Sequence, residues 1–297
     1  MNRESFKRTI RILRRKKWPL VLFVVLIAVV ITAPFVIKTV NAHNRFAVKN
    51  TTPLSRIILV QADREKICLS GHHGFGAQAP ENTTVSIEKA RDYGFNSVEL
   101  DLRQTSDGVW VLCHDADVSA VTDKRGLVSS YTYYDLITCN IDCGANIEKY
   151  ENLKIPTLEQ ALKSCLERNT TPVLDIKSFN DDGIETLLDI IDKNGFTESC
   201  SILSADMSLI EKIHKTNPDI KLYFTTGRLT DKSIQKTADI ENLGICFDGS
   251  KSREKDIEKA VDKKILLLCR NVNDKEAIKR YYKLGVTDFI TDTVYPM

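Results

Sequence analysis

After residue 45, the hydrophobic and polar positions form two patterns that alternate along the chain. Short runs rich in β-branched, aromatic and other apolar residues alternate with longer segments that carry apolar residues at helical spacing. The short runs, typical of strands, are KICLS, SVELDL, VWVLC, PVLDI, CSIL, IKLYF, GICF, KILLL and TDFI. The longer segments, typical of amphipathic helices, cover residues 82–93, 157–168, 183–194, 207–216, 231–239, 253–262 and 274–284. Strands that alternate with helices indicate parallel β-α units.

The number of these units favours a closed barrel. Seven or more β-α units in about 230 residues predict an α/β fold of the TIM (β/α)8 type. A doubly wound open sheet is the alternative. One strand is in excess, because only residues 103–108 separate SVELDL from VWVLC, which is too short for a helix. We therefore expect either a hairpin-like irregularity at this pair or one short run outside the barrel.

The pattern before residue 45 is of another kind. Residues 1–17 hold eight basic residues and one acidic residue, and residues 18–37 hold no charge. Twenty helical residues span about 30 Å, the thickness of the apolar core of a bilayer. Because positive charge stays on the cytoplasmic side, we predict a cytoplasmic tail (1–17), a transmembrane signal anchor (18–37), a tether (38–60) and an extracytoplasmic barrel domain (61–297). The alternative is a signal peptide cleaved after VNA at 40–42.

The net charge of the chain is positive only because of its basic tail, residues 1–17. The remaining chain keeps 34 of the 42 basic residues and 39 of the 40 acidic residues, a formal charge of about −5. A mildly acidic domain argues against binding to nucleic acid, which selects basic surfaces. We therefore expect no nucleic-acid partner.

The eight cysteines give little indication of a disulfide framework or a metal site. Five of them sit in apolar, strand-like runs, where a buried free thiol is the expected state. Cys139 and Cys143 lie in a loop-like stretch and are the pair for which a disulfide is most expected. No CxxC motif is present, which argues against a cysteine zinc site.

Two strand-like runs carry acidic side chains on one face. Alternation along a strand places Glu99 and Asp101 on the face opposite to their apolar neighbours. In the same way Asp175 and Lys177 share a face. In an α/β protein both faces of a strand are covered, and buried carboxylates need a partner. A hard divalent cation is the natural partner, with Asp175 as third ligand and Lys177 as an anion-binding group.

Histidines follow two other apolar runs. His114 ends VWVLC, and His72 ends the run that begins at KICLS, which are positions where barrel enzymes keep catalytic groups. His72 and His73 are adjacent, and adjacent side chains on an extended chain point in opposite directions. We therefore expect them not to share one metal and to play different parts.

Taken in order, these motifs resemble the glycerophosphodiester phosphodiesterase family. The motifs are HHG at 72–74, APENT at 79–83, VELDL at 98–102, SDG at 106–108, HD at 114–115, IPTLEQAL at 155–162, DIK at 175–177 and GVTDFITD at 285–292. The resemblance covers about residues 67 to 295. It implies a TIM barrel of the phospholipase C-like phosphodiesterase type with one divalent metal ion, Ca²⁺ or Mg²⁺.

The resemblance also implies roles for individual residues. His72 and His114 match the family's general acid and base. Glu99, Asp101 and Asp175 match its metal ligands. His73 and Lys177 match its phosphate contacts.

Three departures from the family pattern bear on the substrate. His73 stands where the family usually has arginine, Asp175 replaces glutamate, and Cys269 falls where the family often has tryptophan near the site mouth. The expected reaction is metal-dependent hydrolysis of glycerophosphodiesters, small or lipid-derived, to glycerol 3-phosphate and an alcohol. The alternatives are cleavage of lysophospholipids or glycerol-phosphate polymers at the cell surface, and a non-catalytic barrel that binds phosphodiesters.

Overall fold

The computed structural model describes residues 53–59, 63, 66–179 and 183–296 of the chain. The predicted tail (1–17) and membrane span (18–37) lie outside these residues, so both stay predictions, as does the division of the chain at residue 60. Within the described part of the chain, no helix combines the length and the apolar character that crossing a membrane requires.

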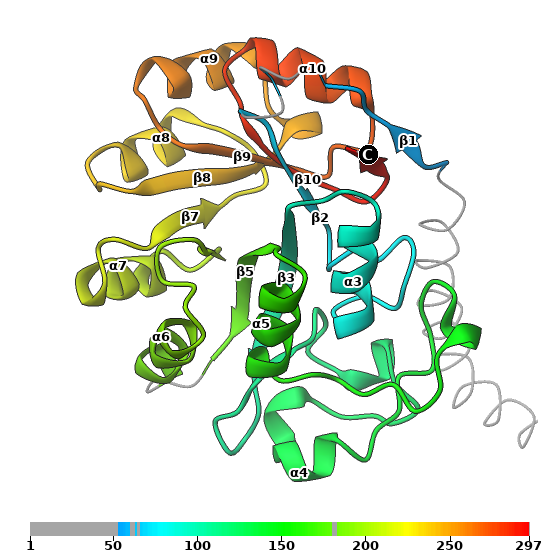
Figure 1. Cartoon of the computed structure of the whole chain (residues 1–297). Coiled ribbons are helices and arrows are strands. Elements are labelled where there is room, and N and C mark those ends of the chain that lie inside the picture. Colours follow the sequence, from blue (N-terminus) through cyan, green and yellow to red (C-terminus); the bar gives the residue numbers. More distant parts are fainter. Residues whose placement is uncertain (1–52, 60–62, 64–65, 180–182, 297) are drawn as a thin grey trace, which may run out of the picture. The chain divides into compact units, whose positions relative to one another are not determined.

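Eight parallel strands close into a barrel within the described residues (Figure 1). In chain order they are β2 (Cys68–Gly71), β3 (Ser97–Gln104), β5 (Thr171–Ser178), β6 (Ser201–Ser204), β7 (Lys221–Thr225), β8 (Leu243–Asp248), β9 (Leu267–Arg270) and β10 (Asp288–Thr291). Each strand pairs with the next along the chain, and β2 pairs with both β10 and β3. The prediction of a TIM barrel is confirmed, and the open sheet is wrong.

Helices connect the barrel strands and cover the outside of the sheet (Figure 1). They are α3 (Thr84–Asp92), α5 (Leu158–Glu167), α6 (Gly183–Lys193), α7 (Met207–Thr216), α8 (Asp231–Ala238), α9 (Glu254–Asp262) and α10 (Lys275–Lys283). Capping boxes fix several of their first turns; Thr157, for example, accepts from the backbone of Gln160, whose side chain accepts from Thr157 in return. A short parallel pair, β1 (Ser55–Arg56) with β11 (Val294–Tyr295), lies beside the barrel.

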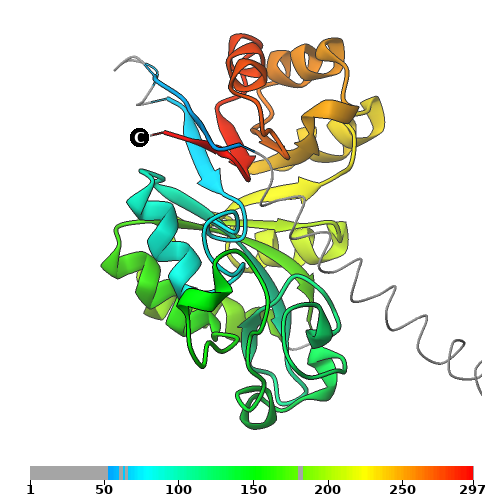
Figure 2. The ribbon, with the colours of Figure 1, turned by 90° about the vertical axis from the view of Figure 1, so that its right-hand side faces the viewer.

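The excess strand is β4 (Trp110–Leu112), which lies outside the closed barrel. It runs antiparallel to β3 after a turn at residues 105–108, and Leu112 pairs with Leu102. This confirms the predicted hairpin. Between β4 and α5 the chain forms a long segment of loops and short helical turns, which lies lowest in Figures 1 and 2. Its helical turns are η1 (Val118–Ala120), η2 (Val128–Ser130), α4 (Tyr133–Leu136) and η3 (Ile147–Lys149).

Side-chain parity divides the buried residues into two cores. One cluster holds a single residue from each of six neighbouring strands and no helix residue, so it fills the inside of the barrel. Its members are Val173, Leu203, Tyr223, Cys246, Leu268 and Ile290. The second core lies between the sheet and the helices and includes Leu267 and Cys269. The parity therefore fixes which residues at the strand ends can face the mouth of the barrel.

All eight cysteines are free thiols. The expected pairing of Cys139 with Cys143 is wrong in this structure. The thiol of Cys143 lies 3.3 Å from the carbonyl oxygen of Ala120 instead, and Cys139 is buried.

Candidate active site

Strand pairing brings the three predicted acidic ligands together. Asp101 of β3 pairs directly with Asp175 of β5, and Glu99 lies one inward-facing position earlier on β3. One carboxylate oxygen from each of the three lies within 4.8 Å of the others, and all three residues are buried. Parity alone predicted that Glu99 and Asp101 share a face; the direct register with β5 adds the third member.

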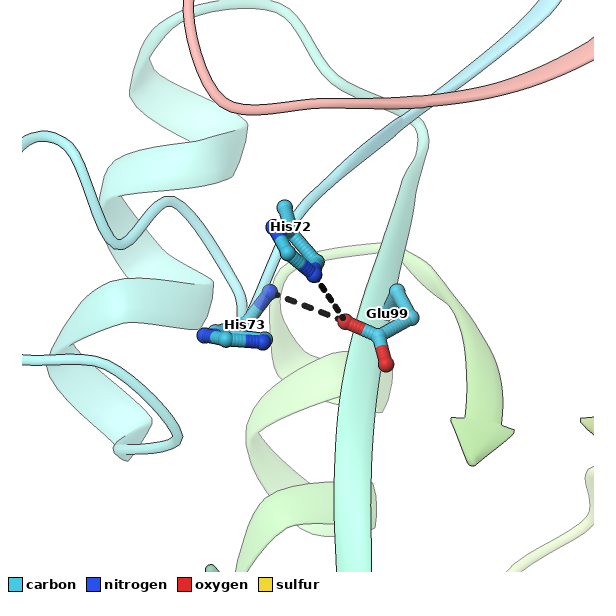
Figure 3. Close-up of side chains that lie close together, drawn as sticks. All are labelled: His72, His73 and Glu99. Carbon is cyan, nitrogen blue, oxygen red and sulfur yellow. Dashed lines mark hydrogen bonds and ion pairs between the residues drawn. The ribbon is translucent and has the colours of Figure 1, made fainter. Parts of the chain in front are cut away.

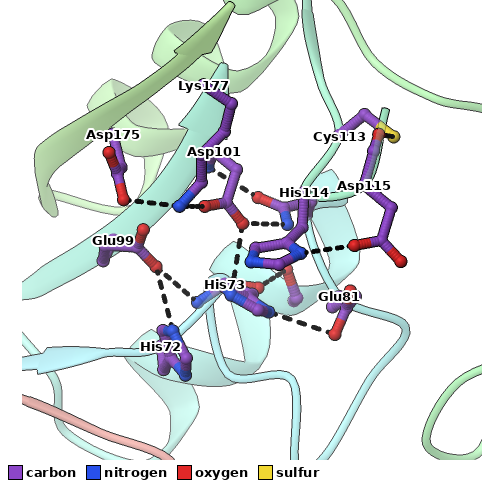
Figure 4. Close-up of polar contacts among 12 residues, drawn as sticks. His72, His73, Glu81, Glu99, Asp101, Cys113, His114, Asp115, Asp175 and Lys177 are labelled. Atoms are coloured by element: carbon purple, nitrogen blue, oxygen red, sulfur yellow. Dashed lines mark hydrogen bonds and ion pairs between the residues drawn. The ribbon is translucent and has the colours of Figure 1, made fainter. Parts of the chain in front are cut away.

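Lys177 lies across two of these carboxylates. Its Nζ is 2.9 Å from Oδ1 of Asp101 and 2.6 Å from Oδ2 of Asp175 (Figure 4). Burial alone would lower the pKa of this lysine, but the nearby carboxylates outweigh burial and raise it. The ammonium group therefore stays charged and offsets part of the negative charge of the cluster.

The carboxylates differ in protonation because their surroundings differ. Burial, with the charge of Asp101, raises the pKa of Glu99 to about 8. Burial would also raise the pKa of Asp101, but the positive charges of His73 and Lys177 hold it well below its usual value. Burial raises the pKa of Asp175. In the metal-free site, Glu99 therefore holds a proton at neutral pH.

His72 follows β2 and turns one ring nitrogen toward the cluster. Its Nδ1 donates to Oδ1 of Asp292 at 2.7 Å. Figure 3 shows the contact of its Nε2 with Oε2 of Glu99, which is 3.8 Å away. A hydrogen bond to a carboxylate at Nδ1 fixes the tautomer that leaves Nε2 free of its proton. Asp292, which follows β10, therefore orients His72.

His73 does not diverge from its neighbour, and the expectation of opposed side chains is wrong. Its φ of 55° is left-handed, so the chain turns here and the two rings lie 3.8 Å apart between centroids. Nδ1 of His73 is 3.0 Å from Oε2 of Glu81, and Nε2 is 3.2 Å from Oδ2 of Asp101. Both ring nitrogens thus face carboxylates, and the phosphate contact of His73 stays a prediction.

His114 reaches the cluster by a route that the sequence pattern did not show. It follows β4, which is no barrel strand, and the antiparallel return of β4 carries it back beside Asp101. The backbone N–H of Cys113 donates to the carbonyl oxygen of Asp101 at 3.0 Å, which continues the pairing to this point. Nδ1 of His114 lies 2.9 Å from Oδ1 of Asp115, and the ring is about one-third exposed.

The structure adds supporting residues that sequence reasoning did not single out. Asn82 donates to Oδ2 of Asp101 at 2.7 Å and accepts from the backbone of Asp101 at 2.9 Å. Arg103 donates twice to the carbonyl oxygen of His114. Asn82 stands in the APENT motif, so the sequence does contain a signal for it. The contact of Arg103 with His114 could not be predicted, because it depends on how β4 pairs with β3.

The strand β9 turns Cys269 away from the site mouth, so the expected position of this residue is wrong. Its side chain is fully buried in the outer core, where its sulfur would lie 2.7 Å from a Cβ placed on Gly249. The residue of β9 on the inward face at that end is Arg270, which parity with Leu268 identifies.

The residues present suit a divalent metal ion. Three carboxylates supply hard oxygen donors within a small volume. Oδ1 of Asp101 is buried and, although Nζ of Lys177 is close, accepts no well-aligned hydrogen bond within the described residues, so a lone pair is available for a cation. One ring nitrogen of His72, one of His73 and one oxygen of Glu99 also lie within 4.8 Å of one another. The two histidines are therefore close enough to share one metal ion, which the extended chain expected from the sequence would not allow.

Comparison with known proteins identifies a family of phosphodiesterases to which the chain is similar. The family model of the glycerophosphoryl diester phosphodiesterase family matches residues 72–295. Glycerophosphodiester phosphodiesterase 1 of Bos taurus is 36% identical over 126 residues, which is 42% of this chain and 38% of that protein. The chain thus matches less than half the length of this relative. A glycerophosphodiester phosphodiesterase of Caldanaerobacter subterraneus is 26% identical over 76% of this chain and 94% of its own.

Solved structures show the same fold. A phosphodiesterase from Oleispira antarctica, in complex with the product sn-glycerol-3-phosphate, has a TM-score of 0.71 and 20% identity over 78% of this chain and 95% of its own. A second structure, from Silicibacter pomeroyi, has a TM-score of 0.68 and 19% identity over 77% of this chain and 90% of its own. With three-quarters of the chain matched by the family model, the chain belongs to the glycerophosphoryl diester phosphodiesterase family.

Proposed function

We propose that this site hydrolyses glycerophosphodiesters to glycerol 3-phosphate and an alcohol. One observation carries the proposal: two histidines, each bonded through Nδ1 to a carboxylate, border a buried cluster of three carboxylates. This arrangement supplies two proton-transfer groups and a cation site in one place, which is what phosphodiester hydrolysis needs. Family membership supports the same reaction.

We propose Glu99, Asp101 and Asp175 as the residues that hold one divalent cation, Ca²⁺ or Mg²⁺. When bound, such an ion polarises a phosphoryl oxygen and offsets the charge that develops on the phosphate. Lys177, beside Asp101 and Asp175, brings a permanent positive charge for the phosphate to the same place.

His72 and His114 are proposed to move the two protons of the reaction. One Nε2 takes the proton of the attacking hydroxyl as its oxygen bonds to phosphorus. The other histidine gives a proton to the alcohol oxygen as its bond to phosphorus breaks. The attacking oxygen belongs to water or to the 2-hydroxyl of the glycerol unit. In the second case a cyclic phosphate forms as the alcohol leaves, and water then opens the ring to give glycerol 3-phosphate. Asp292 and Asp115 stabilise whichever ring is positively charged.

The proposed location is the outer side of the cell membrane, with residues 18–37 as anchor and residues 1–17 in the cytoplasm. The uncharged run and the basic tail before it support this topology. Protease added to intact cells is expected to remove the barrel and leave an epitope on the tail intact. Protection of the barrel would contradict the topology. An extracytoplasmic site, where Ca²⁺ is abundant, favours Ca²⁺ over Mg²⁺.

Release of glycerol 3-phosphate by the full-length chain tests the activity. With glycerophosphocholine and Ca²⁺ or Mg²⁺ we expect turnover that EDTA abolishes and added metal restores. Lysophosphatidylcholine in a parallel assay tests the lipid alternative, since turnover of it alone would move the substrate to lysophospholipids. Metal-loaded protein that binds glycerophosphocholine without cleaving it would favour the non-catalytic barrel.

A further inference from the structure

Arg270 ends β9 on the inward face of the barrel. Leu268, two residues earlier, belongs to the cluster that fills the barrel, while Leu267 and Cys269 belong to the outer core. Alternation along the strand therefore directs the side chain of Arg270 into the barrel at its carboxyl end. This is the edge of the sheet where His72 and Lys177 also lie.

The guanidinium of Arg270 has no partner among the described residues. Its Nε is buried and makes no hydrogen bond, and no ion pair joins the side chain to a carboxylate. By contrast, Arg253 is paired with Asp256 and Arg280 with Glu254. A buried guanidinium nitrogen without a partner costs free energy unless a ligand completes its hydrogen bonds.

The other basic groups at this edge are already engaged. Lys177 lies between Asp101 and Asp175, and His73 lies between Glu81 and Asp101. Arg270 extends from β9, which is four strands away from β5 in either direction around the barrel. Arg270 therefore lies on the side of the barrel opposite to Asp175 and Lys177.

We propose that Arg270 is a substrate-binding residue that holds the phosphate of the phosphodiester, and of the glycerol 3-phosphate product, through its guanidinium. This inference rests on the proposed function. A guanidinium presents donors in a planar fork that fits two phosphate oxygens and stays charged at any working pH. Arg270 thereby supplies a fixed, uncommitted cation in a site whose other basic groups are held by carboxylates.

Exchange of Arg270 tests the proposal in the full-length, metal-loaded chain. In R270Q we expect the KM for glycerophosphocholine and the inhibition constant of glycerol 3-phosphate to rise by about tenfold or more, the scale of a lost charged hydrogen bond. R270K keeps the charge but not the fork, so it is expected to recover only part of the loss. R280Q removes the same charge from an exposed site on α10 and is expected to change neither value by more than about twofold.

Two further readouts distinguish phosphate binding by Arg270 from a purely structural role. If Arg270 only supported the structure, R270Q would lower the affinity for Ca²⁺; we expect that affinity to be unchanged or higher, because a competing positive charge is gone. If R270Q did not fold, R270K would decide, with a rise in KM of at least about threefold expected. KM and inhibition constants within about twofold of wild type would overturn the proposal.

The proposed function can fail without deciding the role of Arg270. If the wild-type chain did not cleave glycerophosphocholine, calorimetric titration with glycerol 3-phosphate and with inorganic phosphate would still compare wild type with R270Q. Weaker phosphate binding by R270Q would then support Arg270 as the phosphate contact of a non-catalytic site. Equal binding by both proteins would overturn it.

Discussion

Both histidines proposed for proton transfer depend on a neighbouring carboxylate for their orientation. Asp292 holds Nδ1 of His72 at 2.7 Å, and Asp115 holds Nδ1 of His114 at 2.9 Å. Such partners fix the ring and its tautomer, and they stabilise the charged form during the reaction. Each proposed proton-transfer group is therefore a pair, made of a histidine and an acid.

We expect Asp292→Asn to lower kcat by about 10- to 100-fold with little change in KM. An asparagine amide can donate to Nδ1 and so favour the tautomer that carries its proton on Nε2. Asp288→Asn is the control, because Asp288 begins the strand that Asp292 follows and pairs with Lys221 at the end away from the site. Steady-state kinetics on glycerophosphocholine measures both, and equal losses in the two variants would show that Asp292 acts on the fold.

The raised pKa of Glu99 links metal binding to pH. Because this pKa is about 8 in the metal-free site, Glu99 is neutral at pH 7 and must lose its proton to become a ligand. We expect the binding of Ca²⁺ to release about one proton at pH 7 and to tighten by up to tenfold per pH unit until about pH 8. Calorimetry in buffers of different ionisation enthalpy counts the protons. Binding without proton release at pH 7 would contradict the raised pKa.

Glycines set the geometry of the loop between β2 and α3, which carries His72 and His73. Gly74 has a φ of +79°, and a Cβ placed on it would lie 2.1 Å from Oγ of Ser86. Gly195 has a similar φ of +74°, but a Cβ there would meet nothing within 4 Å. The two glycines therefore share the backbone requirement and differ in the space available.

We expect Gly74→Ala to lower the free energy of unfolding by at least about 2 kcal/mol more than Gly195→Ala does. Both alanines adopt a strained left-handed backbone, but only the first also displaces Ser86, whose hydroxyl donates to the carbonyl oxygen of His73. Chemical denaturation of both variants gives the difference. Equal destabilisation would mean that the loop adapts and that its shape is not fixed by packing.

The order of strands and helices is predictable from the sequence because each element bears its own hydrophobic period. Positions set by pairing between distant segments are not. The sequence places His114 after a strand, but only the antiparallel register of β4 on β3 brings it to Asp101. The left-handed turn at His73 is not evident because the extended state is the default for a histidine. The burial of Cys269 in the outer core is predictable only once the inward face of β9 is known, because Leu268 and Arg270 take that face and leave Cys269 on the other.

At the scale of the whole molecule, the barrel gathers the chemistry of distant segments at one edge of its sheet. It brings residues from β2, β3, β5, β9 and β10 to this edge, and β4 adds one from outside. The division between structural and chemical residues follows this edge. Apolar side chains fill the barrel interior, and the ion pair of Lys221 with Asp288 lies at the end opposite to the site.

The central claim is that this edge catalyses metal-dependent phosphodiester hydrolysis through its histidines. The most direct test is the kcat of His114→Ala for glycerophosphocholine, measured with saturating Ca²⁺ or Mg²⁺ beside the wild-type chain. His114 is partly exposed, so its ring is not needed to fill the core, and the variant is expected to keep its melting temperature. We predict a fall in kcat of about 100-fold or more. A folded variant that kept more than about a tenth of the wild-type kcat would contradict the claim.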